Sequence, residues 1–223
     1  MEQAVKIGQS FADQFDEDYF ERGAIVGTSG YINYSWMAEL TIRMAHFLIM
    51  NLPLTKGQRV LDYGCAKGFM VKALRLLDIN AYGVDISDYA VSNTPTDAKP
   101  YCCKINSVAD PNCFSQEYDW LLSKDVFEHI SVPDISLLLR RCRKNVAKMF
   151  IVVPLGIDDV SNKFIIPEYD KDVTHITIKT AAWWKRLFIK CGWEIDKFDY
   201  AFKGVKENWT QIWPKGNGFF ILS

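Results

Sequence analysis

A glycine-rich turn between residues 62 and 68 carries the residue types that a nucleotide-binding site needs. The segment reads Val60-Leu61-Asp62-Tyr63-Gly64-Cys65-Ala66-Lys67-Gly68, so an apolar run leads into a turn with two glycines. Glycine adopts backbone conformations that other residues avoid and lets a ligand approach the main chain closely. A helix beginning beyond Gly68 would add free N–H groups and a positive dipole end. The segment is therefore a candidate site for a nucleotide-like ligand.

A carboxylate follows in the next apolar run, where Asp85 ends the sequence Gly83-Val84-Asp85. At the carboxyl end of a strand, this side chain can accept hydrogen bonds from both ribose hydroxyls of an adenosine ligand. Dinucleotide sites favour the pattern Gly-x-Gly-x-x-Gly. Ala66 and Phe69 replace two of those glycines here, which argues against a nicotinamide-dependent oxidoreductase.

Short apolar runs alternate with amphipathic stretches on both sides of this turn. Strands are predicted at residues 59–63, 81–84, 101–105, 120–123, 149–153, 193–200 and 219–222. Helices are predicted at 36–50, 69–77, 132–145 and 181–190, with a short one after residue 87; Ser35, Ser87 and Thr180 are the expected N-caps. Residues 23–34 and 204–218 are expected to be loops. This order predicts right-handed βαβ units and a mostly parallel α/β sheet.

The combination of Asp62, Gly64, Gly68 and Asp85 resembles the class I S-adenosylmethionine-dependent methyltransferases, whose first motif is an acid followed by a glycine-rich turn. Ala66 departs from that motif, where the family often has glycine. The run 118–130 is similar to the family's fourth-strand motif, in which an Asp-apolar strand leads to Glu-His-apolar, and 174–193 resembles the segment before its sixth strand. The resemblance covers about residues 19 to 200. It implies a Rossmann-like sheet of seven strands in the order 3-2-1-4-5-7-6, the last strand antiparallel, with helices on both faces.

The resemblance also implies a cofactor, S-adenosyl-L-methionine, which leaves as S-adenosyl-L-homocysteine. Asp62 would orient its ammonium group, Asp85 would hold the ribose, and Asn106 would reach the adenine amino group. The full set of implied cofactor-binding residues is Tyr19, Asp62, Gly64, Cys65, Ala66, Gly68, Asp85, Ile86, Asn106, Ser123 and Lys124.

Methyl transfer is an in-line displacement, so the protein mainly aligns and desolvates a nucleophile. An oxygen nucleophile often also needs a general base. His129 and His175 are the catalytic candidates, because His46 falls in an apolar helix. A histidine that only pins the loop is the alternative for His175. No metal-binding residues are assigned, since the six cysteines form no Cys-x-x-Cys pair.

The whole chain narrows the class of acceptor. Its 26 basic and 27 acidic residues give a net charge of -1, which offers no electrostatic reason for a nucleic-acid partner. The Asn/Asp-Pro-Pro-aromatic motif of DNA amino-methyltransferases is missing after residue 123. A small-molecule acceptor is left, such as a saccharide or another hydroxylated metabolite, for O-methylation. The alternative is a non-catalytic methyltransferase-like module that binds the cofactor or a protein.

Two parts are expected along the chain: an aromatic N-terminal lid over residues 1–34 and a methyltransferase domain over 35–223. Residues 1–18 lack the apolar core of a signal peptide. The longest apolar stretch, 44–54, is too short to span a bilayer. A cytoplasmic protein without a membrane partner is therefore expected.

Overall fold

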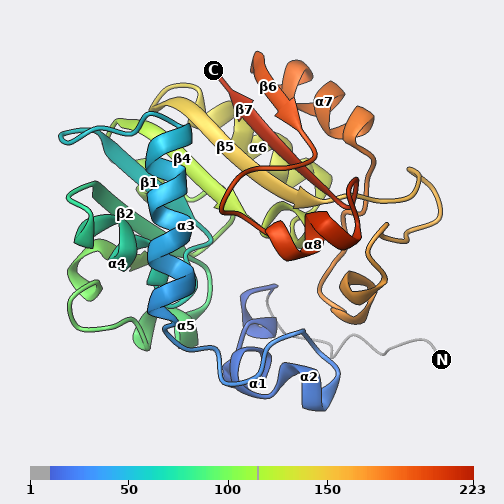
Figure 1. Ribbon diagram of the computed structural model, residues 1–223, viewed down its shortest axis with the longest axis horizontal. Coiled ribbons are helices and arrows are strands. Elements are labelled where there is room, and N and C mark those ends of the chain that lie inside the picture. Colours follow the sequence, from blue (N-terminus) through green and yellow to red (C-terminus); the bar gives the residue numbers. More distant parts are fainter. Residues whose placement is uncertain (1–10, 115) are drawn as a thin grey trace.

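A seven-stranded sheet forms the centre of the computed structural model, which describes residues 11–114 and 116–223. The strand order is β3-β2-β1-β4-β5-β7-β6, and β7 runs antiparallel to both of its neighbours (Figure 1). The implied order and the antiparallel last strand are therefore confirmed. The strands are β1 (Arg59–Tyr63), β2 (Asn80–Asp85), β3 (Cys102–Lys104), β4 (Tyr118–Lys124), β5 (Val146–Pro154), β6 (Ile195–Asp199) and β7 (Asn217–Leu222).

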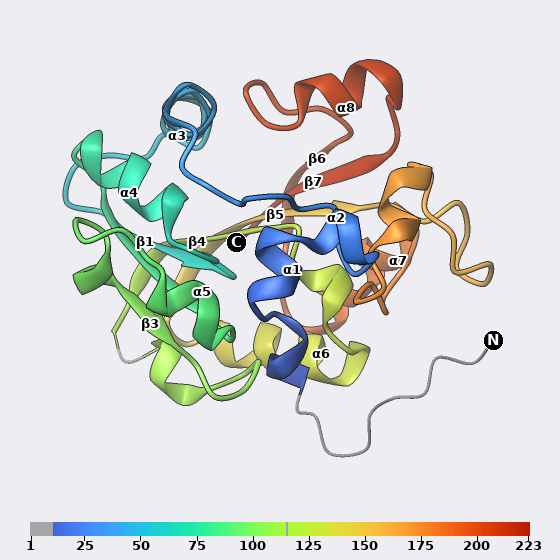
Figure 2. The same ribbon diagram turned by 90° about the horizontal axis from the view of Figure 1, so that it is seen from below.

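Helices cover both faces of the sheet (Figure 2). They are α1 (Glu17–Glu21), α2 (Gly23–Val26), α3 (Ala38–Asn51), α4 (Phe69–Leu76), α5 (Asp88–Ser92), α6 (Val132–Cys142), α7 (Ala181–Lys190) and α8 (Glu207–Ile212). Successive strand residues point to opposite faces. Val60 accordingly packs in the core beneath α3 and α4, and Leu61 in the core beneath α6 and α7. Parallel strands buried on both sides explain the continuous apolar runs in the sequence.

The predicted helix starts were partly correct. Ser87 accepts a hydrogen bond from the Ala90 N–H, and Thr180 accepts one from the Trp183 N–H, as expected for N-caps. The prediction for Ser35 was wrong, because α3 begins later and its N-cap is Met37, without a side-chain bond. The general preference for serine before an apolar helix did not decide this boundary.

Two segments expected to be loops contain helices. α2 begins at Gly23, within the glycine-rich part of the N-terminal segment, and α8 lies inside the polar stretch 204–218. Both are short, and neither has a side-chain cap that would have marked it in the sequence. Residues 1–10 of the expected lid lie outside the described residues.

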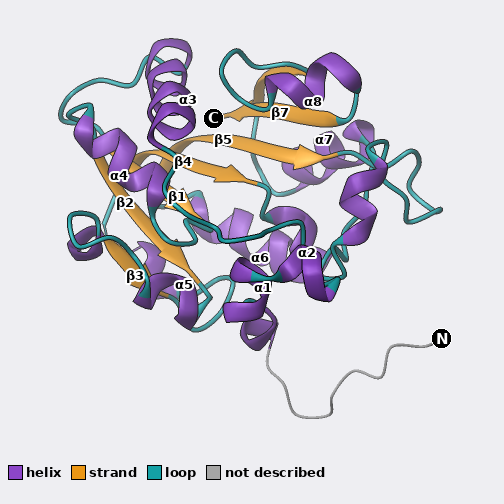
Figure 3. Cartoon of the chain, turned by 60° about the horizontal axis from the view of Figure 1, so that its bottom comes forward, coloured by secondary structure: helices purple, strands orange, loops and turns teal. Residues whose placement is uncertain are grey.

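The N-terminal segment passes across the carboxyl ends of the central strands. Figures 2 and 3 show α1 and α2 in front of the edge to which β1 and β4 point. Carboxyl ends of parallel strands are where open α/β sheets bind ligands. Within the described parts of the chain, every helix is too short or too polar to cross a bilayer.

Candidate functional site

A cavity of about 590 Å³ lies at the carboxyl edge of the sheet, between the strand ends, α3 and the N-terminal segment. Its volume falls in the range of about 300–1,000 Å³ that is typical of small-molecule sites. Most of the predicted cofactor-binding residues line it: Tyr19, Asp62, Gly64, Cys65, Ala66, Asp85, Ile86, Ser123 and Lys124. Residues far apart in the sequence thus meet around one space.

The turn after β1 needs its glycine. Gly64 has φ +81°, in the left-handed region that favours glycine. A Cβ atom at this position would lie 2.3 Å from Cγ2 of Val126. Ala66 also has a positive φ, +48°. A left-handed conformation strains an alanine. Glycine, which the resembling family often has at this position, would adopt it without strain.

Asp85 supports the same turn. Its Oδ2 accepts a hydrogen bond from the Ala66 N–H at 2.7 Å, and its Oδ1 accepts one from the Ser87 N–H at 2.8 Å. A carboxylate has about four acceptor positions, so both oxygens can still accept bonds from a ligand. Burial raises the pKa of Asp85, while these backbone bonds oppose the rise.

Asp62 is the second buried acid in the cavity. It is 8% exposed, and burial together with the neighbouring Asp85 carboxylate raises its pKa to about 7. Lys124 partly offsets this rise. A ligand that brings a cation beside Asp62 would lower this pKa and favour the charged carboxylate.

Ser123 is an independent indication of a ligand-binding site. It lines the cavity, is 1% exposed, and its buried Oγ has no hydrogen-bond partner among the described residues. Buried hydroxyls are normally paired, so an orphan beside a cavity marks a place where a ligand completes the bonding. The acids, the turn and this hydroxyl fit an adenosine-type cofactor with an ammonium group.

Three predicted residues do not line this cavity. Gly68 is the N-cap of α4, with φ +70°. The backbone N–H of Asn106 donates to Oδ2 of Asp110 at 2.9 Å, and its side-chain amide lies 3.4 Å from the same oxygen. His175 lines a separate, smaller hollow formed by residues 162–178. Their predicted contacts with cofactor or acceptor therefore stay predictions.

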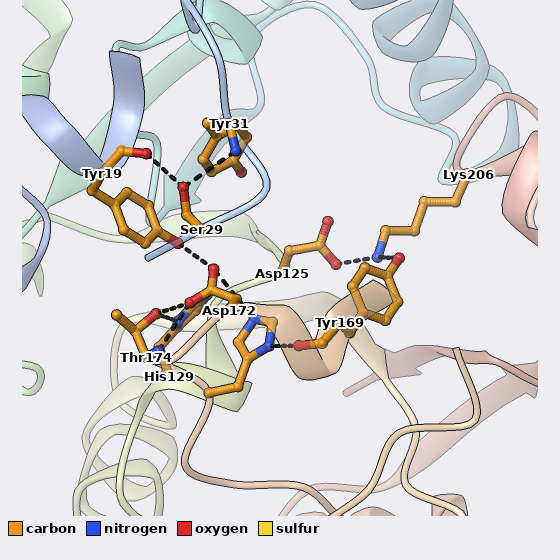
Figure 4. Close-up of polar contacts among 10 residues, drawn as sticks. Tyr19, Ser29, Tyr31, Asp125, His129, Tyr169, Asp172, Thr174 and Lys206 are labelled. Carbon is orange, nitrogen blue, oxygen red and sulfur yellow. Dashed lines mark hydrogen bonds and ion pairs between the residues drawn. The ribbon is translucent and has the colours of Figure 1, made fainter. Parts of the chain in front are cut away.

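A polar network joins the N-terminal segment to the loop after β5 (Figure 4). The Tyr19 hydroxyl donates to Asp172 at 3.0 Å, and the Thr174 hydroxyl donates to the other oxygen of that carboxylate at 2.5 Å. The Nδ1 atom of His129 lies 2.8 Å from the Thr174 hydroxyl oxygen. His129 also lines the cavity, and the ring of His175 lies behind it, with centroids 4.6 Å apart.

Sequence reasoning missed a buried ion-pair network beside β4. Lys206 pairs with Asp125, and its ammonium group donates to the Tyr169 hydroxyl at 2.8 Å and to Asn217 Oδ1 at 2.9 Å. Burial alone would raise the pKa of Asp125, but Lys124 and Lys206 hold it well below its ordinary value. A lone lysine in a polar stretch gives no local signal, so Lys206 could not have been found from the sequence.

Aromatic packing and one ion pair fix the N-terminal segment over the cavity. Tyr19 and Phe20 pack with Ala90 of α5, and Tyr31 and Tyr34 join the same cluster. The Lys67 ammonium group pairs with Glu21 and also donates to the Tyr34 carbonyl at 2.9 Å. Lys67, in the turn after β1, therefore helps to hold the N-terminal segment that lies over this turn.

Comparisons with known proteins agree with this geometry. The family model described as a methyltransferase domain matches residues 36–197. A search of curated proteins found no match.

Three solved structures show the same fold. A SAM-dependent methyltransferase from Archaeoglobus fulgidus has a TM-score of 0.62 at 17% identity, covering 82% of this chain and 93% of that chain. The partner of the Trm112 methyltransferase activator in a complex from Haloferax volcanii has a TM-score of 0.65 at 15% identity, covering 96% of each chain. The glycopeptide N-methyltransferase MtfA, in complex with sinefungin, has a TM-score of 0.59 at 9% identity, covering 82% of this chain and 86% of that chain.

Proposed function

The chain belongs to the class I S-adenosylmethionine-dependent methyltransferases, and from this premise we propose that it methylates an oxygen atom of a small-molecule acceptor. The observation that carries the proposal is a single cavity lined by the glycine turn, the two buried acids and His129. The first two features suit the cofactor, and the third suits an acceptor with an exchangeable proton.

The cofactor, when bound, supplies a methyl group on a sulfonium ion, which is an excellent leaving group. Asp62 would pair with the ammonium group of the cofactor, and Asp85 would accept hydrogen bonds from its ribose hydroxyls. Ser123, whose hydroxyl lacks a partner, donates to or accepts from the bound molecule. The N-terminal segment lies over these residues and would limit the access of water to them.

The acceptor is expected to carry an apolar portion. The wall of the cavity at α3 includes the N-cap residue Met37 and the helix residues Leu40, Met44 and Leu48. Apolar walls with a few placed polar groups are typical of sites for small organic molecules. This wall favours a hydroxylated molecule with an apolar body over a saccharide.

His129 is the better placed of the two histidine candidates. Because Thr174 engages its Nδ1, the second ring nitrogen remains available for a ligand. His175 bonds the Tyr169 carbonyl through Nδ1 at 2.7 Å, and its ring packs against the ring of His129.

Calorimetric titration tests the cofactor half of this proposal. S-adenosylhomocysteine should bind, NAD should not, and Asp85→Asn should weaken binding about tenfold to a hundredfold, the scale of bonds to a charged group. The melting curve of the variant must be recorded, since Asp85 also bonds two backbone amides. Tighter binding of NAD would contradict the proposal.

A screen of hydroxylated aromatic and aliphatic compounds, read by mass spectrometry for a gain of one methylene unit, tests the transfer itself. Methylation at oxygen supports the proposal. Methylation confined to nitrogen or sulfur contradicts the oxygen assignment. Cofactor binding without any product across the screen favours the alternative of a non-catalytic cofactor-binding module.

A further inference from the structure

We propose that Glu128, His129 and His175 hold a divalent first-row transition-metal ion at the wall of the cavity, where the ion binds an oxygen atom of the acceptor. The ion site stands on the geometry of these three side chains, whereas its role toward the acceptor rests on the proposed function. The sequence analysis assigned no metal-binding residues.

The three side chains come together within the span of one coordination sphere. One ligand atom from each lies within 4.8 Å of the others. Two ligands of a tetrahedral zinc ion, at about 2.0–2.1 Å from the metal, are about 3.4 Å apart. Closing the set around an ion therefore needs side-chain movements of about an ångström, well within the reach of rotamer adjustment.

Hydrogen bonds leave the outer nitrogen of each imidazole free for an ion. The Thr174 hydroxyl donates a hydrogen bond to Asp172, so its oxygen accepts a hydrogen bond from the Nδ1–H of His129 at 2.8 Å. His175 Nδ1 likewise donates to the Tyr169 carbonyl at 2.7 Å. Both rings then present Nε2 with a lone pair. Metal-binding histidines are usually fixed in this manner by a carbonyl or an oxygen acceptor on the other nitrogen.

Glu128 supplies a carboxylate that the protein leaves unsatisfied. It is 1% exposed, and its Oε2 has no hydrogen-bond partner among the described residues. Buried polar atoms are normally paired, and a carboxylate oxygen is a common metal ligand. Such an atom beside two free imidazole nitrogens is a reason to expect an ion.

The surrounding charges also leave room for a cation. The partly exposed Lys124 and the buried Lys206 ammonium group both pair with Asp125. Asp172 receives its hydrogen bonds from the neutral donors of Tyr19 and Thr174. Its Oδ2 lies 3.9 Å from His175 Nε2.

The backbone holds the two contributing segments together. Glu128 and His129 lie in a 3₁₀ turn, Phe127–His129, that follows β4. The N–H groups of Ile176 and Thr177 both donate to the Glu128 carbonyl, at 2.8 and 2.9 Å. His175 is thereby fixed next to Glu128, which is the pre-organisation that a metal site needs.

Two imidazoles and one carboxylate select the class of ion. This donor set suits Zn²⁺, Fe²⁺, Mn²⁺ or Co²⁺ rather than Mg²⁺ or Ca²⁺, which prefer oxygen ligands. Three protein ligands leave coordination positions open, as in catalytic zinc sites. Because His129 lines the cavity, an open position there can hold an acceptor oxygen.

Metal titration of the full chain tests the site. The chelator-treated protein is titrated with Zn²⁺, and its metal content is measured after dialysis. We expect one ion per chain, and we expect Glu128→Gln and His175→Ala to weaken binding more than about tenfold, since even supporting groups of metal sites have effects of that size. His46→Ala is the matched control, because it removes the third of the three histidines from the exposed surface of α3.

Each variant is also titrated with S-adenosylhomocysteine, which reports both folding and the proposed function. A wild-type chain that retains no Zn²⁺, or a His46→Ala variant that loses as much as His175→Ala, overturns the metal site. Cofactor binding without metal binding would therefore overturn the metal site and leave the proposed function. Metal binding without cofactor binding would contradict the proposed function and leave the metal site.

The Co²⁺ form tests the open position. Acetohydroxamate, a chelator that binds through oxygen, should shift the visible absorption of the Co²⁺ protein. An unchanged spectrum at saturating acetohydroxamate overturns the role toward the acceptor, because an ion with a closed coordination sphere cannot bind an acceptor oxygen.

Discussion

Two buried carboxylates lie near the ends of β1 and β2, and their surroundings give them different tasks. Asp85 is bonded by two backbone N–H groups, which keep its oxygens in place for a neutral hydroxyl-bearing ligand. Burial and the negative charge of Asp85 raise the pKa of Asp62 to about 7. Asp62 is therefore poised to accept a cationic group, which would restore its charge.

The pKa of Asp62 predicts how cofactor affinity depends on pH. In the free protein Asp62 is mostly protonated at pH 6 and mostly charged at pH 8. Because the proposed pairing with the cofactor's ammonium group needs the charged form, the affinity for S-adenosylhomocysteine should rise about tenfold between these pH values. Calorimetric titration across pH 5.5 to 8.5 measures this rise.

The stability of the free protein should change in the opposite direction. The folded state binds the Asp62 proton more tightly than the unfolded state does, so this contribution to stability is present at low pH and is lost as pH rises to about 7. Asp62→Asn preserves the shape of the side chain and should flatten the pH dependence of both cofactor affinity and stability. An affinity that rises equally in Asp62→Asn would assign the pH dependence to another group.

At the scale of elements, local patterns predicted the strands and the turn well. The bounds of β1 were predicted to the residue, because a buried apolar run stops at a glycine that only a turn explains. Ser87 and Thr180 were correct as N-caps since their bonds are local. The start of α3 and the existence of α8 were missed, because tertiary packing, and not a local cap, sets them.

The turn between β1 and α4 makes a prediction about Gly64. Gly64→Ala should destabilise the protein by roughly 2–4 kcal/mol, which combines the strain of a positive φ with the overpacking against Val126. The double variant Gly64→Ala, Val126→Ala should regain part of this loss, because the second change removes the atoms that the new Cβ meets. Denaturant unfolding of the single and double variants measures both effects.

Ala66→Gly is the control for this experiment. Its positive φ is relieved by glycine, so this variant should fold and still bind S-adenosylhomocysteine. If the effects of Gly64→Ala and Val126→Ala simply add, the two side chains do not collide, and the predicted geometry of the turn is wrong.

At the scale of the whole molecule, the contacts that complete the cavity join residues that no local pattern connects. Tyr19 and Asp172 are separated by 153 positions, and Lys206 and Asp125 by 81. Periodicity and capping report on neighbours in the chain, so the sequence indicated that an aromatic segment and a long loop existed but not that they meet. The resemblance to a family supplied the order of the strands, and the fold supplied these pairs.

The N-terminal segment lines the cavity and bonds to both halves of the molecule. On one side the Ser87 hydroxyl donates to the Phe15 carbonyl, and on the other the Tyr19 hydroxyl donates to Asp172. If this segment acts as the expected lid, a bound cofactor leaves when the segment opens. The strength of these bonds should therefore set the rate of release.

Tyr19→Phe should loosen this cover without removing its aromatic packing. Loss of one hydrogen bond to a charged group is worth about 1.5–3 kcal/mol, so opening should become about tenfold to a hundredfold more frequent. Hydrogen exchange of the amides in residues 17–34 should speed up, and S-adenosylhomocysteine should dissociate faster in stopped-flow chase experiments. Tyr200→Phe is the matched control, because Tyr200 follows β6 and does not line the cavity. Equal exchange rates in Tyr19→Phe and the wild-type chain would show that the Tyr19–Asp172 bond does not limit opening of the segment. In that case the cover would open independently of the Asp172 network, and release would be limited by packing around Phe20 and Tyr31.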